Sequence, residues 1–251
     1  MSVIAEIEEM FVKPLGSWPL LLQSIRNSGD LEEVWPLIKH VYYNPVPLPT
    51  LVVNSLMALM GLRCQEHYCF VIHSMYVVSE GADPEAINAL GRFFTVPIDD
   101  SPRWTRIVGL AWLSDGDDKE AQLADHTLKT LVTEEEYAKL KDVMKLANVV
   151  MSYVKRDQIP LEKEPALTMI PQHARELMPK FVEFHMQLKG SGQGDQPVCT
   201  TCASCNKVRA KADGVWFERE VVEPTLPDNV LYSHGLCEPC AEQMLADIPA
   251  A

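Results

Sequence analysis

Four cysteines near the end of this chain have the spacing of a metal site. Cys202-Ala-Ser-Cys205 and Cys237-Glu-Pro-Cys240 are two C-x-x-C pairs that flank a predicted hairpin. Two residues between thiolates let each pair bend around one tetrahedral ion, and zinc is the ion that such sites hold. The sequence therefore predicts a structural Zn²⁺ site in which four thiolates leave no open position for water.

Two neighbouring residues leave the ligand set open. Cys199 lies three positions before Cys202, and His234 lies three positions before Cys237, so either could replace a thiol. We treat both as spare or supporting residues. The alternative to a metal is a set of reduced dithiols. We favour the metal because residues 197–251 are too few to build a core alone, and a bound ion would stabilise their fold.

A second group of thiols and imidazoles lies in the apolar stretch RCQEHYCFVIHS, residues 63–74. Cys69 and His73 are four apart, so on a helix they share a face. An imidazole there, together with the helix N-terminus, would lower the thiol pKa. Cys64 can approach Cys69 only if a turn precedes Glu66, because positions five apart on one helix point in different directions.

Other interpretations of this second group stay open. Cysteine is among the most buried residue types, so Cys69 could be an inert core thiol and His73 a satisfied core histidine. A metal site of His67, Cys69 and His73 is a further alternative, although residues 67 and 69 do not share a helix face.

Helix start and stop signals place these residues on a mainly helical scaffold. Pro49 and Thr50 begin a helix that Gly61 should end, and a second predicted helix runs from residue 66 to a left-handed end near Gly81. Pro-containing starts predict further helices from residues 84 and 102. A capping box of Thr133 and Glu136 begins a long amphipathic helix, and Pro179 should bend or divide a later one.

Residues from roughly 30 to 160 resemble the carboxymuconolactone decarboxylase and alkylhydroperoxidase D-like family, an all-α fold that assembles as oligomers. The resemblance is carried by the helix ending at Gly61, by EHYCFVIHSMYVVSEGADPEAI, and by SPRWTRIVGLAWL with the long helix after it. Cys69 and His73 fall on the second Cys and the His of the family's C-x-x-C-x-x-x-H.

The resemblance implies a catalytic scheme for these residues. Cys69 would attack a hydroperoxide, a first Cys would resolve the sulfenic acid as a disulfide, and a Glu one helix earlier would relay protons with His73. The first-Cys position here holds Glu66, and the relay position falls near Asn54. Cys64 is therefore the remaining candidate for a resolving thiol; without one, an outside reductant is needed.

The segments CASCNKVRAKADGVWF and YSHGLCEPC resemble a small zinc-ribbon-like domain found at the ends of bacterial signalling proteins. That domain shows C-x-x-C-K-K-x-R, a Gly-x-Trp and S-H-G-[IL]-C-P-x-C. Asn206 stands at one of its basic positions, and Glu238-Pro239 replaces its Pro-x. The resemblance implies a structural or interaction role with a protein partner.

Composition limits the partners and the compartment. The 22 Lys and Arg against 35 Asp and Glu give a net charge of −13, which repels a phosphate backbone and disfavours nucleic acid. No positive leader, cleavage site or long apolar run predicts secretion or a membrane span. We therefore expect a cytoplasmic protein whose seven cysteines are reduced, metal-bound or catalytic.

The expected architecture is mainly α. It comprises an all-α alkylhydroperoxidase D-like helical domain over residues 1–160, a helical connector with a Gly/Ser linker over 161–196, and a zinc-bound β-hairpin or ribbon domain over 197–251. We expect a homo-oligomer assembled through the helical domain, with a protein partner or reductant.

Two functions from different classes follow. The first is a thiol-dependent hydroperoxide reductase, or a degenerate copy of one, with Cys69 as nucleophile, His73 as base or relay, and Cys64 as resolving thiol. The second is a non-enzymatic signalling or scaffold protein whose zinc ribbon docks a partner. A carboxymuconolactone decarboxylase-type lyase ranks third, because nothing in the sequence identifies a site for a lactone carboxylate. We favour the first, with reduced or altered redox activity.

Overall fold

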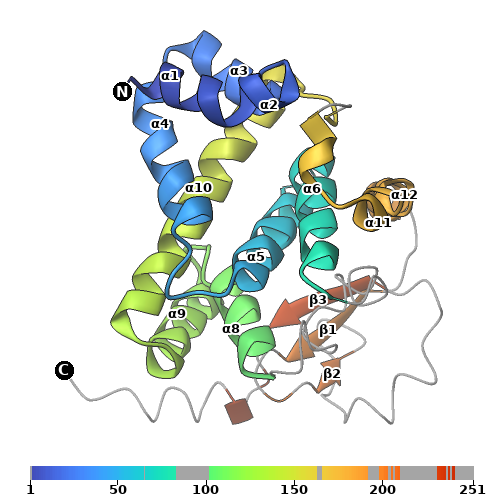
Figure 1. The fold of residues 1–251 in the computed structure, drawn as a ribbon. Helices are drawn as coiled ribbons and strands as arrows, with labels where there is room; N and C mark the ends of the chain where they lie inside the picture. The colour runs from blue at the N-terminus through green and yellow to red at the C-terminus, as the bar shows by residue number, and fades with distance from the viewer. Residues whose placement is uncertain are drawn as a thin grey trace. The chain divides into compact units, whose positions relative to one another are not determined.

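The computed structural model is mainly helical, as the sequence predicts (Figure 1). The chain forms two compact units, residues 1–82 with 138–186, and residues 83–137 with 187–251. The expected domain bounds at residues 160 and 196 stay a prediction. The structure describes residues 2–64, 66–82, 102–162, 166–191, 198–202, 205, 207–209, 231–235, 237 and 239–240.

The first unit begins with short helical segments. Its first half comprises α1 (Val3–Ile7), the π-helical turn η1 (Glu8–Val12), α2 (Lys13–Leu15), α3 (Leu20–Ser28), α4 (Leu31–Ile38) and a second π-helical turn, η2 (Lys39–Tyr43). Gly29 ends α3 at a φ of 83°, a left-handed conformation that glycine adopts without strain. Isolated π-helical turns are frequent at functional sites, and η2 carries Tyr42 and Tyr43.

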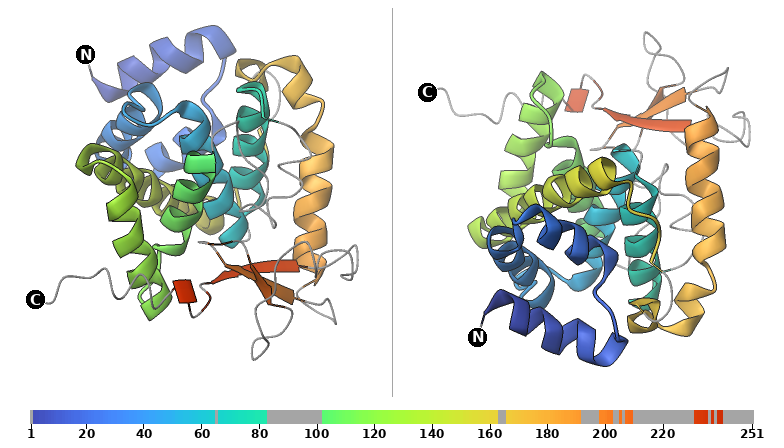
Figure 2. Two further views of the ribbon diagram at one scale, coloured as in Figure 1. Left: turned by 90° about the horizontal axis from the view of Figure 1, so that it is seen from below. Right: turned by 90° about the horizontal axis from the view of Figure 1, so that it is seen from above.

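A pair of buried helices, α5 (Thr50–Arg63) and α6 (His67–Ser79), lies side by side in this unit (Figures 1 and 2). The predicted helices from residues 50 and 66 are confirmed. Gly61 does not end α5, because the helix continues to Arg63 and Cys64 forms its C-cap. Gly61 instead allows close contact, since a Cβ there would lie 2.6 Å from the backbone nitrogen of Phe70.

The long helix α10 (Glu134–Asp157) begins with the predicted capping box. The backbone nitrogen of Glu136 donates to Thr133 Oγ1 at 3.2 Å, and the backbone nitrogen of Thr133 donates to Glu136 Oε2 at 2.8 Å. Later residues of α10 bind the first helices, because Tyr153 donates its hydroxyl to Asp30 at 2.6 Å and Lys139 Nζ donates to the carbonyl of His40 at 2.5 Å.

The chain then continues through η4 (Ala166–Met169), α11 (Gln172–Arg175) and α12 (Met178–Ser191). The predicted division of this segment is present, but the break precedes Met178, so Pro179 lies in the first turn of α12. Proline fits there because the first-turn N–H groups have no helical partner. Helix α12 extends two residues, Gly190 and Ser191, into the expected linker, and residues 192–197 lie outside the described part.

The second unit contains α8 (Pro102–Leu113) and α9 (Lys119–Leu131), together with the strands β1 (Val198–Cys202), β2 (Val208–Arg209) and β3 (Leu231–Gly235). The sheet order is β2-β1-β3, with β2 antiparallel and β3 parallel to β1. Helix α8 begins at Pro102 as predicted. The predicted helix from residue 84 and the β-leaning GVWFEREVV lie outside the described residues.

None of the helices in the described part combines the length and the apolar character needed to cross a bilayer.

Candidate functional site

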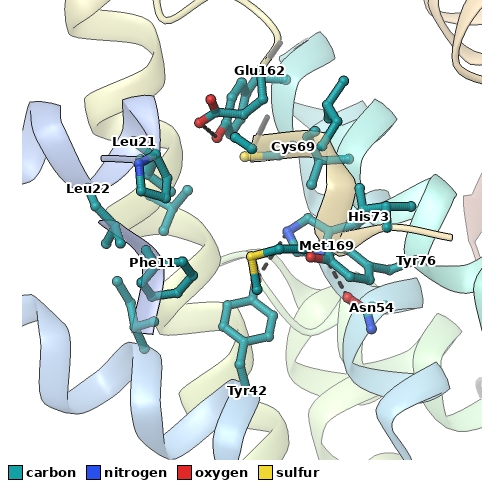
Figure 3. Close-up of a pocket in the computed structure, with 18 of the residues that line it drawn as sticks. Phe11, Leu21, Leu22, Tyr42, Asn54, Cys69, His73, Tyr76, Glu162 and Met169 are labelled. Atoms are coloured by element: carbon teal, nitrogen blue, oxygen red, sulfur yellow. Dashed lines mark hydrogen bonds between the residues drawn. The ribbon is translucent and has the colours of Figure 1, made fainter. Parts of the chain in front are cut away.

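A pocket of about 350 Å³ lies within the first unit (Figure 3). Its walls come from the N-terminal helices, η2, α5, α6 and the chain after α10. It is largely apolar, and its polar groups are few. The aromatic residues that line it are Phe11, Trp35, Tyr42, Tyr43, Tyr68 and Tyr76. Such a cavity is the usual form of a small-molecule site.

His73 is fixed in this pocket by hydrogen bonds at both ring nitrogens. Nδ1 lies 2.9 Å from Asn54 Oδ1, and Nε2 lies 3.1 Å from the hydroxyl of Tyr42. Asn54 donates its Nδ2 to the carbonyl of Thr50 at 3.2 Å, which directs Oδ1 towards the imidazole. His73 Nδ1–H therefore donates to Asn54, and the Tyr42 hydroxyl donates to Nε2.

The imidazole of His73 is neutral in this arrangement. Burial lowers the pKa of His73 from 6.5 to about 3. Asn54, near which the sequence resemblance places a relay Glu, contacts the histidine. An amide has no proton to release, so this contact orients His73 without relaying protons.

Cys69 lines the same pocket and is 1% exposed. Its Cβ packs against Gly61 of α5, where an added Cβ would lie 3.1 Å away. Burial raises the pKa of Cys69 from 9.0 to about 12, and the charges of Glu66 and Cys64 add to that rise. Among the described residues no hydrogen bond joins Cys69 to His73, so the expected imidazole assistance is not formed.

Cys64 and Glu66 lie on the turn that connects α5 to α6. Cys64 is the C-cap of α5, Glu66 is the N-cap of α6, and the backbone nitrogen of Glu66 donates to the carbonyl of Gly61 at 2.9 Å. The turn that Cys64 needs in order to approach Cys69 is therefore present.

Glu162 is a polar residue of the pocket that sequence reasoning missed. Its Oε1 accepts the Tyr68 hydroxyl at 3.0 Å and the backbone N–H of Leu20 at 2.6 Å. Burial raises the pKa of Glu162, and the Tyr68 hydroxyl with the backbone N–H groups of Leu20 and Leu21 opposes the rise. Figure 3 draws Cys69 between Glu162 and His73. No sequence signal marks Glu162, because it reaches the pocket from a segment without helical periodicity.

The alternative metal site of His67, Cys69 and His73 does not form in the part of the chain that the structure describes. His67 lies instead against His185, with ring centroids 5.9 Å apart. His73 uses both nitrogens in other bonds, as given above. Within the described residues, Cys69 and His73 therefore belong to the wall of a pocket and not to a metal centre.

The four downstream cysteines do gather into one cluster. The sulfur atoms of Cys202, Cys205, Cys237 and Cys240 all lie within 4.8 Å of one another, and those of Cys205 and Cys237 are 3.5 Å apart. None of the four forms a disulfide in the described part of the chain. Cys199 and His234 lie in β1 and β3, and their side chains are outside the described part.

Burial raises the pKa of Cys205 and of Cys237 to about 11. Four thiols this close cannot all ionise at neutral pH unless a cation compensates their charge. The cluster is thus suited to holding a metal ion, whose binding would release the thiol protons.

Comparison with protein-family models, with curated proteins and with solved structures finds no match to this chain.

Proposed function

We propose that the first unit is a binding domain for a small organic molecule, built on a hydroperoxidase-like helical scaffold that no longer supports thiol catalysis. The second interpretation from the sequence, a non-enzymatic signalling or scaffold protein, is therefore the one that we prefer. The proposal keeps the resemblance to the alkylhydroperoxidase D-like family as its structural premise.

The state of Cys69 carries this proposal. Burial raises the pKa of Cys69 to about 12, so the thiol is almost entirely protonated at neutral pH. The thiolate is the nucleophile that would attack a hydroperoxide, so the resting site is poorly prepared for that step. His73 has no nitrogen left for the thiol, and Glu66 stands where the resemblance expects a second thiol.

The shape and lining of the pocket suit the binding of a small molecule without thiol chemistry. It encloses about 350 Å³, and Tyr42, Asn54 and His73 form a fixed hydrogen-bond chain in an otherwise apolar lining. Sites for small molecules commonly combine apolar walls with a few oriented polar groups. The exposed Tyr43 and Met169 add apolar side chains to the lining.

A slow hydroperoxide reductase is the second candidate, favoured by the position of Cys64 on the turn before α6. A sulfenic acid on Cys69 would have a thiol nearby for resolution. The lyase interpretation is not favoured, since Glu80 and Glu162 line the pocket and would repel the carboxylate of a lactone substrate.

For the downstream cluster we propose a structural Zn²⁺ held by Cys202, Cys205, Cys237 and Cys240. Zn–S bonds of about 2.3 Å in a tetrahedron place sulfur atoms about 3.8 Å apart, which suits the observed cluster. The ion would supply a closed cross-link for a short segment, and the surface around it would dock a protein partner. The six described cysteines form no disulfide, which favours a reducing compartment, and we propose the cytoplasm.

Turnover of an organic hydroperoxide with a dithiol reductant tests the proposal. We expect wild-type protein and the Cys69→Ser variant to consume hydroperoxide at equal rates, at the background set by reductant alone. A wild-type rate well above that of Cys69→Ser would instead establish the reductase. The Cys64→Ser variant then separates resolution by Cys64 from resolution by the reductant.

A further inference from the structure

The pocket in the first unit carries formal charge of one sign only. Among the described residues that line it, the charged side chains are the carboxylates of Glu80 and Glu162, and no Lys or Arg is present. His73 adds no charge, because it is neutral. An anionic ligand would meet these carboxylates in an apolar setting without a compensating cation, which is unfavourable. The lining thus favours neutral or positively charged ligands.

Glu162 is the more enclosed of the two carboxylates. The groups that bind its Oε1 are the Tyr68 hydroxyl and the backbone N–H of Leu20, and both are neutral. None of the ion pairs within the described part of the chain involves Glu162. Leu20 is the first residue of α3, so Glu162 lies at the N-terminus of that helix, and the helix dipole offsets part of its charge. No cationic side chain of the described residues pairs with it, so a bound cation could satisfy its remaining lone pairs and charge.

Aromatic side chains surround the same space. Figure 3 shows Phe11, Tyr42 and Tyr76 around the pocket that Glu162 enters. The face of an aromatic ring attracts an ammonium group, and the attraction grows when both are removed from water. Rings and a carboxylate together provide what a buried organic cation needs, an apolar enclosure and a counter-charge.

The size of the pocket and the charge of the chain point in the same direction. A volume of about 350 Å³ is at the low end for small-molecule sites, so the ligand is small. The net charge of −13 raises the local concentration of cations near the protein.

We propose that the pocket binds a small organic amine, with its ammonium group against Glu162 and the aromatic rings and its apolar body in the remaining space. The inference rests on the proposed binding function and adds the chemical class of the ligand. The inference concerns the charge of the ligand, whereas the hydroperoxide turnover measurement concerns the reactivity of Cys69. The ligand class and the proposed binding function can therefore fail separately.

A matched series of ligands tests this assignment by calorimetry on the full-length protein. Phenylpropylamine, phenylpropanol and phenylpropionate share one body and differ in charge. We expect the amine to bind at least about ten-fold more tightly than the alcohol, and the acid to bind most weakly. Affinity for the amine should fall as Glu162 becomes protonated in acid, whereas affinity for the alcohol should not.

Glu162→Gln provides the decisive variant, because glutamine keeps the shape and the acceptor oxygen for Tyr68 and Leu20. We expect the amine preference to disappear while the alcohol still binds, which also shows that the pocket is intact. Glu32→Gln, an exposed change on α4, is the matched control and should keep the preference. Equal binding of amine and alcohol, survival of the preference in Glu162→Gln, or no binding of any of the three compounds would each overturn the assignment.

Discussion

Cys69 and His73 lie on one face of α6, as their spacing predicts, and the structure places both in the wall of the pocket. The residues around them nevertheless determine the hydrogen bonding of His73 and the protonation of Cys69. Asn54 and Tyr42 satisfy both nitrogens of His73, and Glu66 raises the pKa of Cys69 together with burial. Spacing alone decides which residues can meet, whereas the surrounding groups decide whether they react.

Replacing Glu66 by Gln tests the electrostatic part of this description. The carboxylate of Glu66 disfavours the Cys69 thiolate, so Glu66→Gln should lower the pKa of Cys69 and move its alkylation to lower pH. The pKa should stay above its ordinary value, because burial is the larger cause. The rate of alkylation of the Cys69 peptide, followed by mass spectrometry across pH, gives the shift.

Glu32→Gln removes an equal charge from an exposed site on α4 and is the control for Glu66→Gln. An unchanged Cys69 profile is expected for it. If both variants shift the pH profile of Cys69 alkylation equally, the net charge of the protein and not the position of Glu66 sets the pKa of the Cys69 thiol.

His73 should make the first unit sensitive to acid. Its pKa is about 3 in the folded protein against 6.5 as the ordinary value, so the unfolded chain binds a proton first as pH falls. The contribution to stability is complete above the unfolded pKa and is lost progressively from there down to the folded pKa. We expect a loss of about 2 kcal/mol in the free energy of unfolding between pH 7 and about pH 5 from this group.

Urea unfolding at a series of pH values measures that loss. His73→Gln should have a flatter profile over the same range, whatever its stability at neutral pH. A profile of equal slope in the variant would mean that His73 does not carry the acid sensitivity.

At the scale of elements, the pair α5 and α6 forms the wall that holds Cys69, His73 and Asn54. Helix α5 is buried on all sides from Val52 to Gly61, so packing and not surface patterning fixes its position. The close contact at Gly61 sets how near the two helices come.

Gly61→Ala should destabilise the protein. The new Cβ would lie 2.6 Å from the backbone nitrogen of Phe70, which cannot move without separating the helices. We expect a loss of about 1–3 kcal/mol from this overpacking, despite the better helix propensity of alanine. Chemical denaturation measures the loss.

Ser55→Ala is the matched control on the same helix. The Ser55 hydroxyl is buried without a hydrogen-bond partner among the described residues, so its removal should leave stability unchanged or raise it. A loss in Ser55→Ala as large as that in Gly61→Ala would contradict the role given to close packing.

Local signals predicted the helices well because capping and turn chemistry act within a few residues. The box of Thr133 and Glu136 and the left-handed Gly81 are both present. The role of Gly61 was misjudged, since glycine serves equally for a helix end and for close packing. Tyr42 and Glu162 were missed because they meet only through tertiary folding, from positions far apart in the sequence.

At the scale of the whole molecule, two compact units carry different chemistry. The first holds the lined pocket, and the second holds the four-cysteine cluster. The expected homo-oligomer and protein partner stay predictions. None of the four cluster cysteines lines the pocket, so a substitution in one site leaves the residues of the other unchanged.

The cluster should bind one zinc ion per chain and lose it in acid. Thiols must release their protons to bind the metal, so affinity should fall as pH falls. Cys237→Ser should reduce the metal content measured by elemental analysis, and chelation should unfold the C-terminal segment of the wild type.

Cys64→Ser is the control for metal content, because Cys64 lies outside the cluster and should not alter it. Full-length protein purified without stoichiometric metal, and unchanged on chelation, would contradict the proposed zinc site.

The pH titration of Cys69 in the wild-type protein tests the central claim most directly, namely that the pocket thiol stays protonated. Alkylation of the Cys69 peptide should keep accelerating above the ordinary thiol pKa of 9.0, without a plateau near neutral pH. A half-maximal rate near or below neutral pH would show an activated thiolate and would contradict the proposed binding role.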